Sequence, residues 1–239
     1  MTTFVLVHGA WGGAHGFHLL RPLLRARDHE VVTPALTGIG ERSHLTGPHV
    51  GLGLHVRDVV NVVLYEDLDD IVLLGFSYGG MVVTGALDEI GARVRELVYL
   101  DAFVPADGQS AADLAPAMDA AIQASGGDGG LGAPWLIPAP QREYEDPAEG
   151  AWSAPRRSPQ PIATFTEPVR CAVPVDDRRL GRTYIRATGG PDVTGGAFEA
   201  AAAHARSSDA WRYHEIETTH MVPQNRPEEL AAILLDLAT

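Results

Sequence analysis

One serine of the chain lies between glycines, at Gly75, Ser77 and Gly79, in the stretch LLGFSYGGMV of residues 73–82. The Gly-x-Ser-x-Gly pattern alone is a weak signal, because 26 of the 239 residues are glycine. Here, however, it follows the apolar run 71–74, an expected strand, and precedes an expected helix over 80–90. A tight strand-to-helix turn needs small residues and exposes the serine hydroxyl at the edge of a sheet. This context favours a nucleophilic serine over a structural serine in a glycine-rich turn.

A serine hydroxyl is a poor nucleophile until a base removes its proton. His220, in ETTHMVPQNRPEEL, follows an expected last strand over 213–216 and precedes an expected last helix over 227–237. Loops after the strands of a parallel sheet meet at one edge, so His220 should lie on the same side as Ser77. Eight of the other histidines have no comparable position, and no histidine spacing indicates a metal site.

Hydrolysis of an acyl group also needs backbone N–H donors that stabilise an oxyanion. The residue after the nucleophile, Tyr78, would supply one N–H. The loop HGAWGG, residues 8–13, follows the first expected strand, and the N–H of Ala10 is the second candidate because Gly9 allows close approach.

These loops require a parallel sheet that brings them together. Short apolar runs alternate with amphipathic stretches, which indicates an α/β fold with a mainly parallel sheet and helices on both faces. Residues 105–178 are rich in Pro, Gly, Ala and Ser and lack this rhythm. We therefore expect a core of residues 1–104 and 179–239, with residues 105–178 forming a cap over the site. The expected elements are strands over 4–7, 30–33, 71–74, 97–100, 183–187 and 213–216, and helices over 17–27, 52–65, 80–90, 197–206 and 227–237.

Composition excludes several classes of function. The formal net charge is −13, which argues against nucleic acid and anionic membranes as partners. All 18 basic residues are arginine, so no lysine Schiff base can form. Cys171 is the single cysteine, and no cysteine-based zinc site is possible. The N-terminus reads as a strand rather than a signal peptide, so we expect a soluble cytoplasmic protein, monomer or homodimer, that acts on a small molecule.

Several segments resemble the α/β-hydrolase superfamily, in the branch of plant methylesterases, hydroxynitrile lyases and bacterial esterases such as pyrethroid hydrolases. They are FVLVHGAWGG, TGIGERSHL, DVVNVVLYEDLDDIVLLGFSYGGMVVTGA, LVYLDAFVPADGQS and TYIRAT. The resemblance covers most of the chain but not residues 110–178. It implies a Ser-His-Asp triad with no metal and no organic cofactor.

The resemblance leaves the acid of the triad open between two residues. The family usually places it after the strand that is TYIRAT here, where GGPDVTGG offers Asp192. The alternative is Asp101, at the end of the strand LVYL. We favour Asp192 on motif position. Lyases of this branch carry Thr and Lys where Gly9 and Met221 stand, so ester hydrolysis is favoured over cyanohydrin cleavage.

The sequence thus predicts a cofactor-free serine carboxylesterase. Two alternatives are a tailoring enzyme that acts on a lactone or polyketide, and a non-catalytic small-molecule-binding protein of the same fold. Apolar residues of the catalytic loops and of residues 105–178 should line the pocket and select an apolar ester. They are Trp11, Phe76, Phe103, Trp135, Trp152 and Met221.

Overall fold

A six-stranded parallel sheet forms the centre of the computed structural model, which describes residues 1–115, 122 and 133–238. The strand order is β2-β1-β3-β4-β7-β8, and every pairing is parallel. Each expected strand is present, which confirms the α/β fold class. The strands are β1 (Thr3–Val7), β2 (Glu30–Val32), β3 (Ile71–Phe76), β4 (Val94–Leu100), β7 (Gly181–Ala187) and β8 (Arg212–Ile216).

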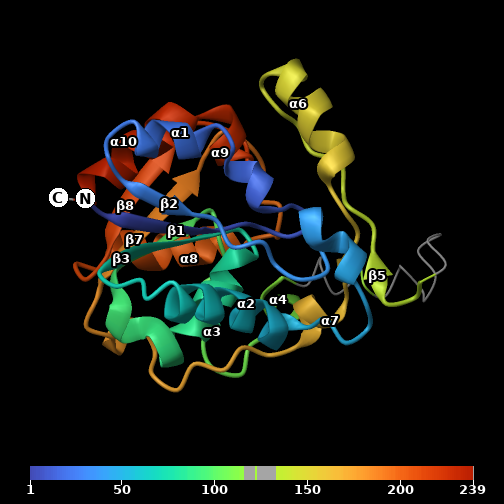
Figure 1. Cartoon of the computed structure of the whole chain (residues 1–239), viewed down its shortest axis with the longest axis horizontal. Coiled ribbons are helices and arrows are strands. Elements are labelled where there is room, and N and C mark those ends of the chain that lie inside the picture. The colour runs from blue at the N-terminus through green and yellow to red at the C-terminus, as the bar shows by residue number, and fades with distance from the viewer. Residues whose placement is uncertain (116–121, 123–132, 239) are drawn as a thin grey trace.

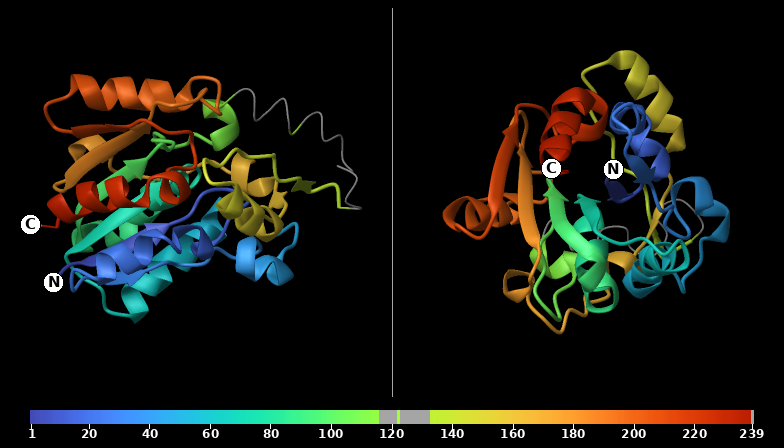
Figure 2. Two further views of the ribbon diagram at one scale, coloured as in Figure 1. Left: turned by 90° about the horizontal axis from the view of Figure 1, so that it is seen from above. Right: turned by 60° about the vertical axis from the view of Figure 1, so that its left-hand side comes forward.

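Helices cover both faces of the sheet (Figures 1 and 2). One face carries α1 (Leu20–Arg25), α9 (Val222–Asn225) and α10 (Pro227–Asp236). The other carries α2 (Leu52–Tyr65), α3 (Gly79–Ile90) and α8 (Ala197–Ser207). Successive residues of a strand point to opposite faces, so Phe4 and Leu6 join the core under α1 while Val5 and Val7 join the core under α2 and α3. Both cores are apolar because both sheet faces are covered.

The helix expected over 17–27 is shorter in the structure. A 3₁₀ helix, η1 (Ala14–Phe17), precedes α1, and α1 then begins at Leu20. Pro22 therefore lies in the first turn of α1, where a helix needs no backbone N–H donor. The other 3₁₀ helices are η2 (Gly40–Leu45), η3 (Gly91–Arg93), η4 (Ala154–Arg156) and η5 (Val175–Asp177).

Residues 105–178, between β4 and β7, are called the insertion below. Their described part lies mainly beyond the carboxyl ends of the strands, at the end of the molecule opposite to both termini (Figures 1 and 2). Its elements are α4 (Ala111–Leu114), β5 (Leu136–Ile137), α6 (Pro147–Ser153), β6 (Gln160–Pro161) and α7 (Ala163–Thr166). Strands β5 and β6 pair antiparallel as a separate small sheet. The division into a core and a cap of residues 105–178 stays a prediction.

The last part of this segment runs back along the core. Ala172 N–H donates to the Asp88 carboxylate at 2.8 Å, and the Arg178 guanidinium donates to the Leu87 carbonyl at 2.7 Å, both at the end of α3.

Among the described residues, no helix combines the length and apolar character needed to cross a bilayer.

Candidate active site

Ser77 lies in the turn between β3 and α3, with a left-handed backbone (φ 57°). Its N–H donates to the Leu100 carbonyl at 3.1 Å, which fixes the turn against β4. A Cβ on Gly79 would lie 2.6 Å from the Val7 carbonyl oxygen, and a Cβ on Gly75 would lie 2.7 Å from the Gly79 carbonyl oxygen. Both distances are too short for any side chain, so the turn requires glycine at these two positions.

His220 follows β8 and joins Ser77 to a buried carboxylate. Its Nε2 lies 3.0 Å from Ser77 Oγ, and its Nδ1 lies 2.7 Å from Asp101 Oδ2. The imidazole stacks between the rings of Phe76 and Phe198, with centroid distances of 4.9 and 5.5 Å. A carboxylate accepts, so Nδ1 carries the proton and Nε2 is free to accept one from the serine hydroxyl.

The expectation that Asp192 lies against His220 is corrected by this geometry, because Asp101 occupies that place. Asp101 directly follows β4 and is 2% exposed. Its second oxygen, Oδ1, accepts from the Arg186 guanidinium and from Ala187 N–H at 3.3 Å. Both oxygens of the carboxylate thus accept hydrogen bonds, which fixes its orientation toward His220.

Asp192 has a different role in the structure. Its carboxylate accepts from Thr194 N–H at 2.8 Å and from Glu199 N–H at 2.9 Å, at the start of α8. It also pairs with Nη2 of Arg186 at 3.6 Å, whereas Nη1 of the same arginine faces Asp101. Burial opposes ionisation, but the hydrogen bonds from Thr194 and Glu199 hold the pKa of Asp192 below its ordinary value. Asp192 therefore stabilises the start of α8, and it shares Arg186 with Asp101 as an ion-pair partner.

Two backbone N–H groups beside Ser77 are free of protein acceptors in the described part of the chain, those of Ala10 and Tyr78. Both residues line one pocket with Ser77. The neighbouring Trp11 also has a left-handed backbone (φ 59°), and its N–H donates to Gln160 Oε1 at 2.8 Å. The two predicted oxyanion donors are thus available, and the insertion holds the loop that carries one of them.

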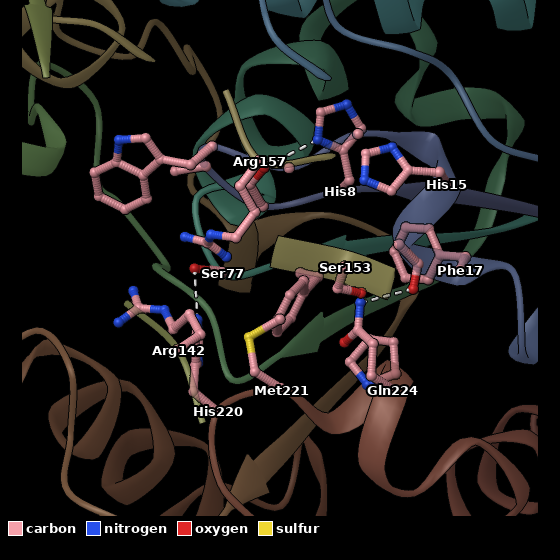
Figure 3. A pocket seen from close by; sticks show the side chains of 18 of the residues that line it. His8, His15, Phe17, Ser77, Arg142, Ser153, Arg157, His220, Met221 and Gln224 are labelled. Carbon is pink, nitrogen blue, oxygen red and sulfur yellow. Dashed lines mark hydrogen bonds between the residues drawn. The ribbon is translucent and has the colours of Figure 1, made fainter. Parts of the chain in front are cut away.

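Two pockets meet at Ser77. The apolar pocket, of about 240 Å³, lies against Ala10, Trp11, Tyr78 and residues of the insertion and α8. The second pocket, of about 40 Å³, lies on the side of His220 (Figure 3). We call it the polar pocket because His220 and two arginines line it, beside apolar residues. The apolar pocket is lined by Ala10, Trp11, Ser77, Tyr78, Phe103, Ala115, Ile137, Pro138, Pro140, Arg142, Phe165, Val193, Thr194 and Phe198. Lining residues of the polar pocket include His8, His15, Phe17, Arg142, Tyr144, Ser153, Arg157, His220, Met221 and Gln224.

The predicted pocket residues divide between lining and packing positions. Trp11 lines both pockets, Phe103 lines the apolar pocket, and Phe76 and Met221 line the polar pocket. Trp135 and Trp152 line neither pocket. Trp152 stacks on His18 at 4.0 Å between ring centroids, and Trp135 accepts Ile162 N–H through its carbonyl. The contacts of these two tryptophans lie outside both pockets, and the expectation that they contact substrate stays a prediction.

Comparison with known families agrees with this architecture. Residues 4–233 match the model of the Alpha/beta hydrolase family. The chain belongs to the alpha/beta hydrolase family. Within that family, it is 51% identical over 116 residues to a carbendazim hydrolyzing esterase of Nocardioides sp. strain SG-4G, which covers 48% of each chain. It is 33% identical over 108 residues to an alpha-hydroxynitrile lyase of Arabidopsis thaliana, covering 43% of this chain and 40% of the lyase.

The matched stretch thus spans about half the length of these curated relatives or less. Plant methylesterases and a bacterial pyrethroid hydrolase are also similar, which confirms the expected branch of the alpha/beta hydrolases. Among solved structures, an extracellular alpha/beta-hydrolase from a Paenibacillus species superposes with a TM-score of 0.80 over 99% of this chain and 98% of its own, at 24% identity. At that identity the likeness shows the fold.

The sequence analysis missed the residues that the insertion brings to the pockets. Gln160, Arg142 and Arg157 lie where the sequence has no periodic pattern. Phe198 was predicted to be helical but not to contact His220. Such contacts depend on how the insertion folds over the sheet, and no motif in the sequence marks them.

Proposed function

We propose that this protein is a serine hydrolase that cleaves a carboxylic ester through an acyl-enzyme, without a metal or organic cofactor. The observation that carries the proposal is the hydrogen-bonded series from Ser77 through His220 to Asp101, with two free backbone N–H groups beside the serine. The similarity to an esterase supports the same reaction class.

In the first half of the reaction, Ser77 Oγ attacks the ester carbonyl carbon while His220 Nε2 takes the hydroxyl proton. Asp101 holds the imidazole by its Nδ1–H and stabilises the imidazolium without taking the proton. The carbonyl oxygen becomes an oxyanion, which accepts from the N–H groups of Ala10 and Tyr78. Collapse of this intermediate breaks the ester C–O bond, and His220 returns its proton to the leaving alcohol.

The second half repeats these steps with water. His220 takes a proton from a water molecule whose oxygen attacks the acyl carbon. The tetrahedral intermediate then releases the carboxylic acid, and the proton returns to Ser77 Oγ. The apolar pocket adjoins Ser77 and both oxyanion donors, so an apolar acyl group would be held there.

The test is covalent labelling together with turnover. We expect a fluorophosphonate probe to label Ser77 stoichiometrically, and Ser77→Ala to lose labelling and at least about 10³-fold of the hydrolysis of p-nitrophenyl butyrate. The matched control is Ser207→Ala, which removes an exposed hydroxyl at the end of α8. A folded wild-type protein that the probe does not label would contradict the proposal and favour a non-catalytic binding protein.

A further inference from the structure

Two arginines of the insertion reach the site where the ester would react. Arg142 lines both pockets at Ser77, and Arg157 lines the polar pocket. Figure 3 shows both guanidinium groups pointing toward the space beside Ser77 and His220. The two cations belong to different parts of the insertion, one after β5 and one after η4, and they meet at this pocket.

Neither arginine has an anionic partner among residues 1–115, 122 and 133–238. Arg157 Nε and Nη2 are shielded from solvent and have no hydrogen-bond acceptor. Tyr144, whose side chain is a phenol and not a carboxylate, is the neighbour that raises the pKa of both arginines against the effect of burial. Burial, and then the neighbouring charge of Arg157, lower the pKa of Arg142 to about 10. Two half-buried like charges that have no counter-ion among the described residues are unfavourable, and an anion between them would lower that cost.

Three carboxylates close to residues of the polar pocket already have partners. Glu41 pairs with His15 at 3.2 Å. Glu149 accepts from the Ser153 hydroxyl at 2.7 Å, and Glu145 pairs with Arg226. The described protein residues therefore leave the anion to come from the substrate.

The position of His220 decides which part of an ester enters the polar pocket. His220 Nε2 must give its proton to the leaving alcohol, so the alcohol part lies on the His220 side of Ser77. His220 lines the polar pocket and not the apolar one. The volume of about 40 Å³ leaves room for a group of a few heavy atoms, such as a carboxylate.

We infer that Arg142 and Arg157 form a carboxylate subsite, and that the substrate is an ester of an apolar acid with a small alcohol that carries a carboxylate. This inference rests on the proposed esterase function and adds the substrate class. A guanidinium binds a carboxylate through paired N–H donors, and two guanidinium groups supply more donors than the two oxygens require.

The experiment compares two esters with the same acyl group, (butanoyloxy)acetate and its neutral isostere (butanoyloxy)acetamide. We expect wild-type kcat/KM to be about 10-fold or more higher for the carboxylate ester, because its charge alone meets the two arginines. Arg142→Gln and Arg157→Gln should each lower this ratio toward one. Arg170→Gln, which changes an exposed arginine of the same insertion that lines neither pocket, should preserve it.

A second readout does not need turnover. Glycolate should slow fluorophosphonate labelling of Ser77 in wild type and in Arg170→Gln, glycolamide should not, and the protection should be lost in Arg157→Gln. Two results would overturn the subsite. One is a kcat/KM ratio near one in a wild-type protein that cleaves both esters. The other is a kcat/KM ratio and a protection that are both unchanged in Arg142→Gln and Arg157→Gln. Failure of the esterase proposal looks different, because Ser77 is then not labelled at all.

Discussion

At the residue scale, three non-glycine residues of the site have left-handed backbones. They are Trp11 (φ 59°), Ser77 (φ 57°) and Asp101 (φ 41°). Such conformations cost on the order of 1–3 kcal/mol each and persist where surrounding bonds hold them. Ser77 N–H is held by Leu100 and Asp101 N–H by Ile185, each through a backbone carbonyl. The strained residues are thus the serine, its proposed acid Asp101, and Trp11 beside the predicted oxyanion donor Ala10. Backbone hydrogen bonds to neighbouring strands hold Ser77 and Asp101 in this conformation.

The role of Asp101 can be separated from that of Asp192 by mutation. Asp101→Asn should lower kcat by about 10⁴-fold, because an amide favours the wrong imidazole tautomer of His220. Asp192→Asn should change kcat by less than about 10-fold and should reduce the free energy of unfolding by about 1 kcal/mol, since it weakens the start of α8. Steady-state kinetics and urea unfolding of both variants check this. A large loss of kcat confined to Asp192→Asn would assign the acid to that residue instead.

The sequence predicted Ser77 and His220 because each follows a recognisable strand. It favoured Asp192 over Asp101 as the acid, although both aspartates follow strands, and the structure places Asp101 against His220. The choice depends on the bond that Asp101 makes across 119 positions of the chain, and on Arg186, which lies between the two carboxylates. Local pattern contains no information on which carboxylate faces the imidazole and which faces the guanidinium.

At the element scale, the loop between β1 and η1 is fastened by the insertion. Gln160 is fully buried, and its Oε1 accepts from Trp11 N–H while its Nε2 donates to Thr164 Oγ1 at 2.8 Å. Trp11 also donates through its indole N–H to the Ile137 carbonyl at 3.2 Å and accepts Ser158 N–H. The peptide next to Ala10 N–H is therefore oriented by residues more than 120 positions away.

Gln160 is accordingly a positioning residue for the predicted oxyanion donor Ala10. Gln160→Leu should lower kcat by roughly 10-fold or more with little change in KM, because a displaced donor affects the transition state more than substrate binding. Gln160→Glu keeps the oxygen that accepts Trp11 N–H and should recover part of the loss. Steady-state kinetics of the two variants check this. Equal losses in both, or a change confined to KM, would indicate a general packing role.

The elements of the core were predictable and those of the insertion were not. The strand residues 71–74 and the helix 52–65 have apolar periodicity, and the structure contains both, the helix with the same bounds. Strands β5 and β6 have two residues each, and α7 has four. Elements this short carry no periodic signal, and they form because they pack on the loops that follow the long strands.

At the scale of the whole molecule, the division of roles follows the layers of the fold. The sheet supplies the residues proposed for chemistry, and the insertion supplies Arg142, Arg157 and Gln160. The net charge of −13 would repel an anionic substrate at a distance. Arg142 and Arg157, which have no carboxylate partner among the described residues, would oppose this repulsion where the proposed carboxylate binds.

Two buried neutral histidines, His8 after β1 and His55 in α2, hydrogen-bond to the loops that follow β1, β2 and β3. His8 Nδ1–H donates to the Gly9 carbonyl and its Nε2 accepts Leu36 N–H. His55 Nε2–H donates to the Thr37 carbonyl at 2.8 Å, and its Nδ1 accepts the Tyr78 hydroxyl at 2.9 Å. Burial lowers the pKa of His8 from 6.5 to about 4 and that of His55 from 6.5 to about 3. A second proton would break the hydrogen bond that each imidazole accepts, from Leu36 N–H in His8 and from the Tyr78 hydroxyl in His55.

Acid should therefore destabilise the fold through these histidines. Below pH 6.5 each imidazole binds a proton in the unfolded chain but not in the folded one, so stability falls as pH falls, until the folded groups titrate near pH 4 and 3. Between pH 6 and 5 each should contribute a slope of up to about 1.4 kcal/mol per pH unit. Urea unfolding at pH 7, 6 and 5 measures it. His55→Gln should remove one histidine's share of the slope, whereas His44→Gln, at an exposed position, should not. An unchanged slope in His55→Gln would mean that His55 is protonated in the folded protein.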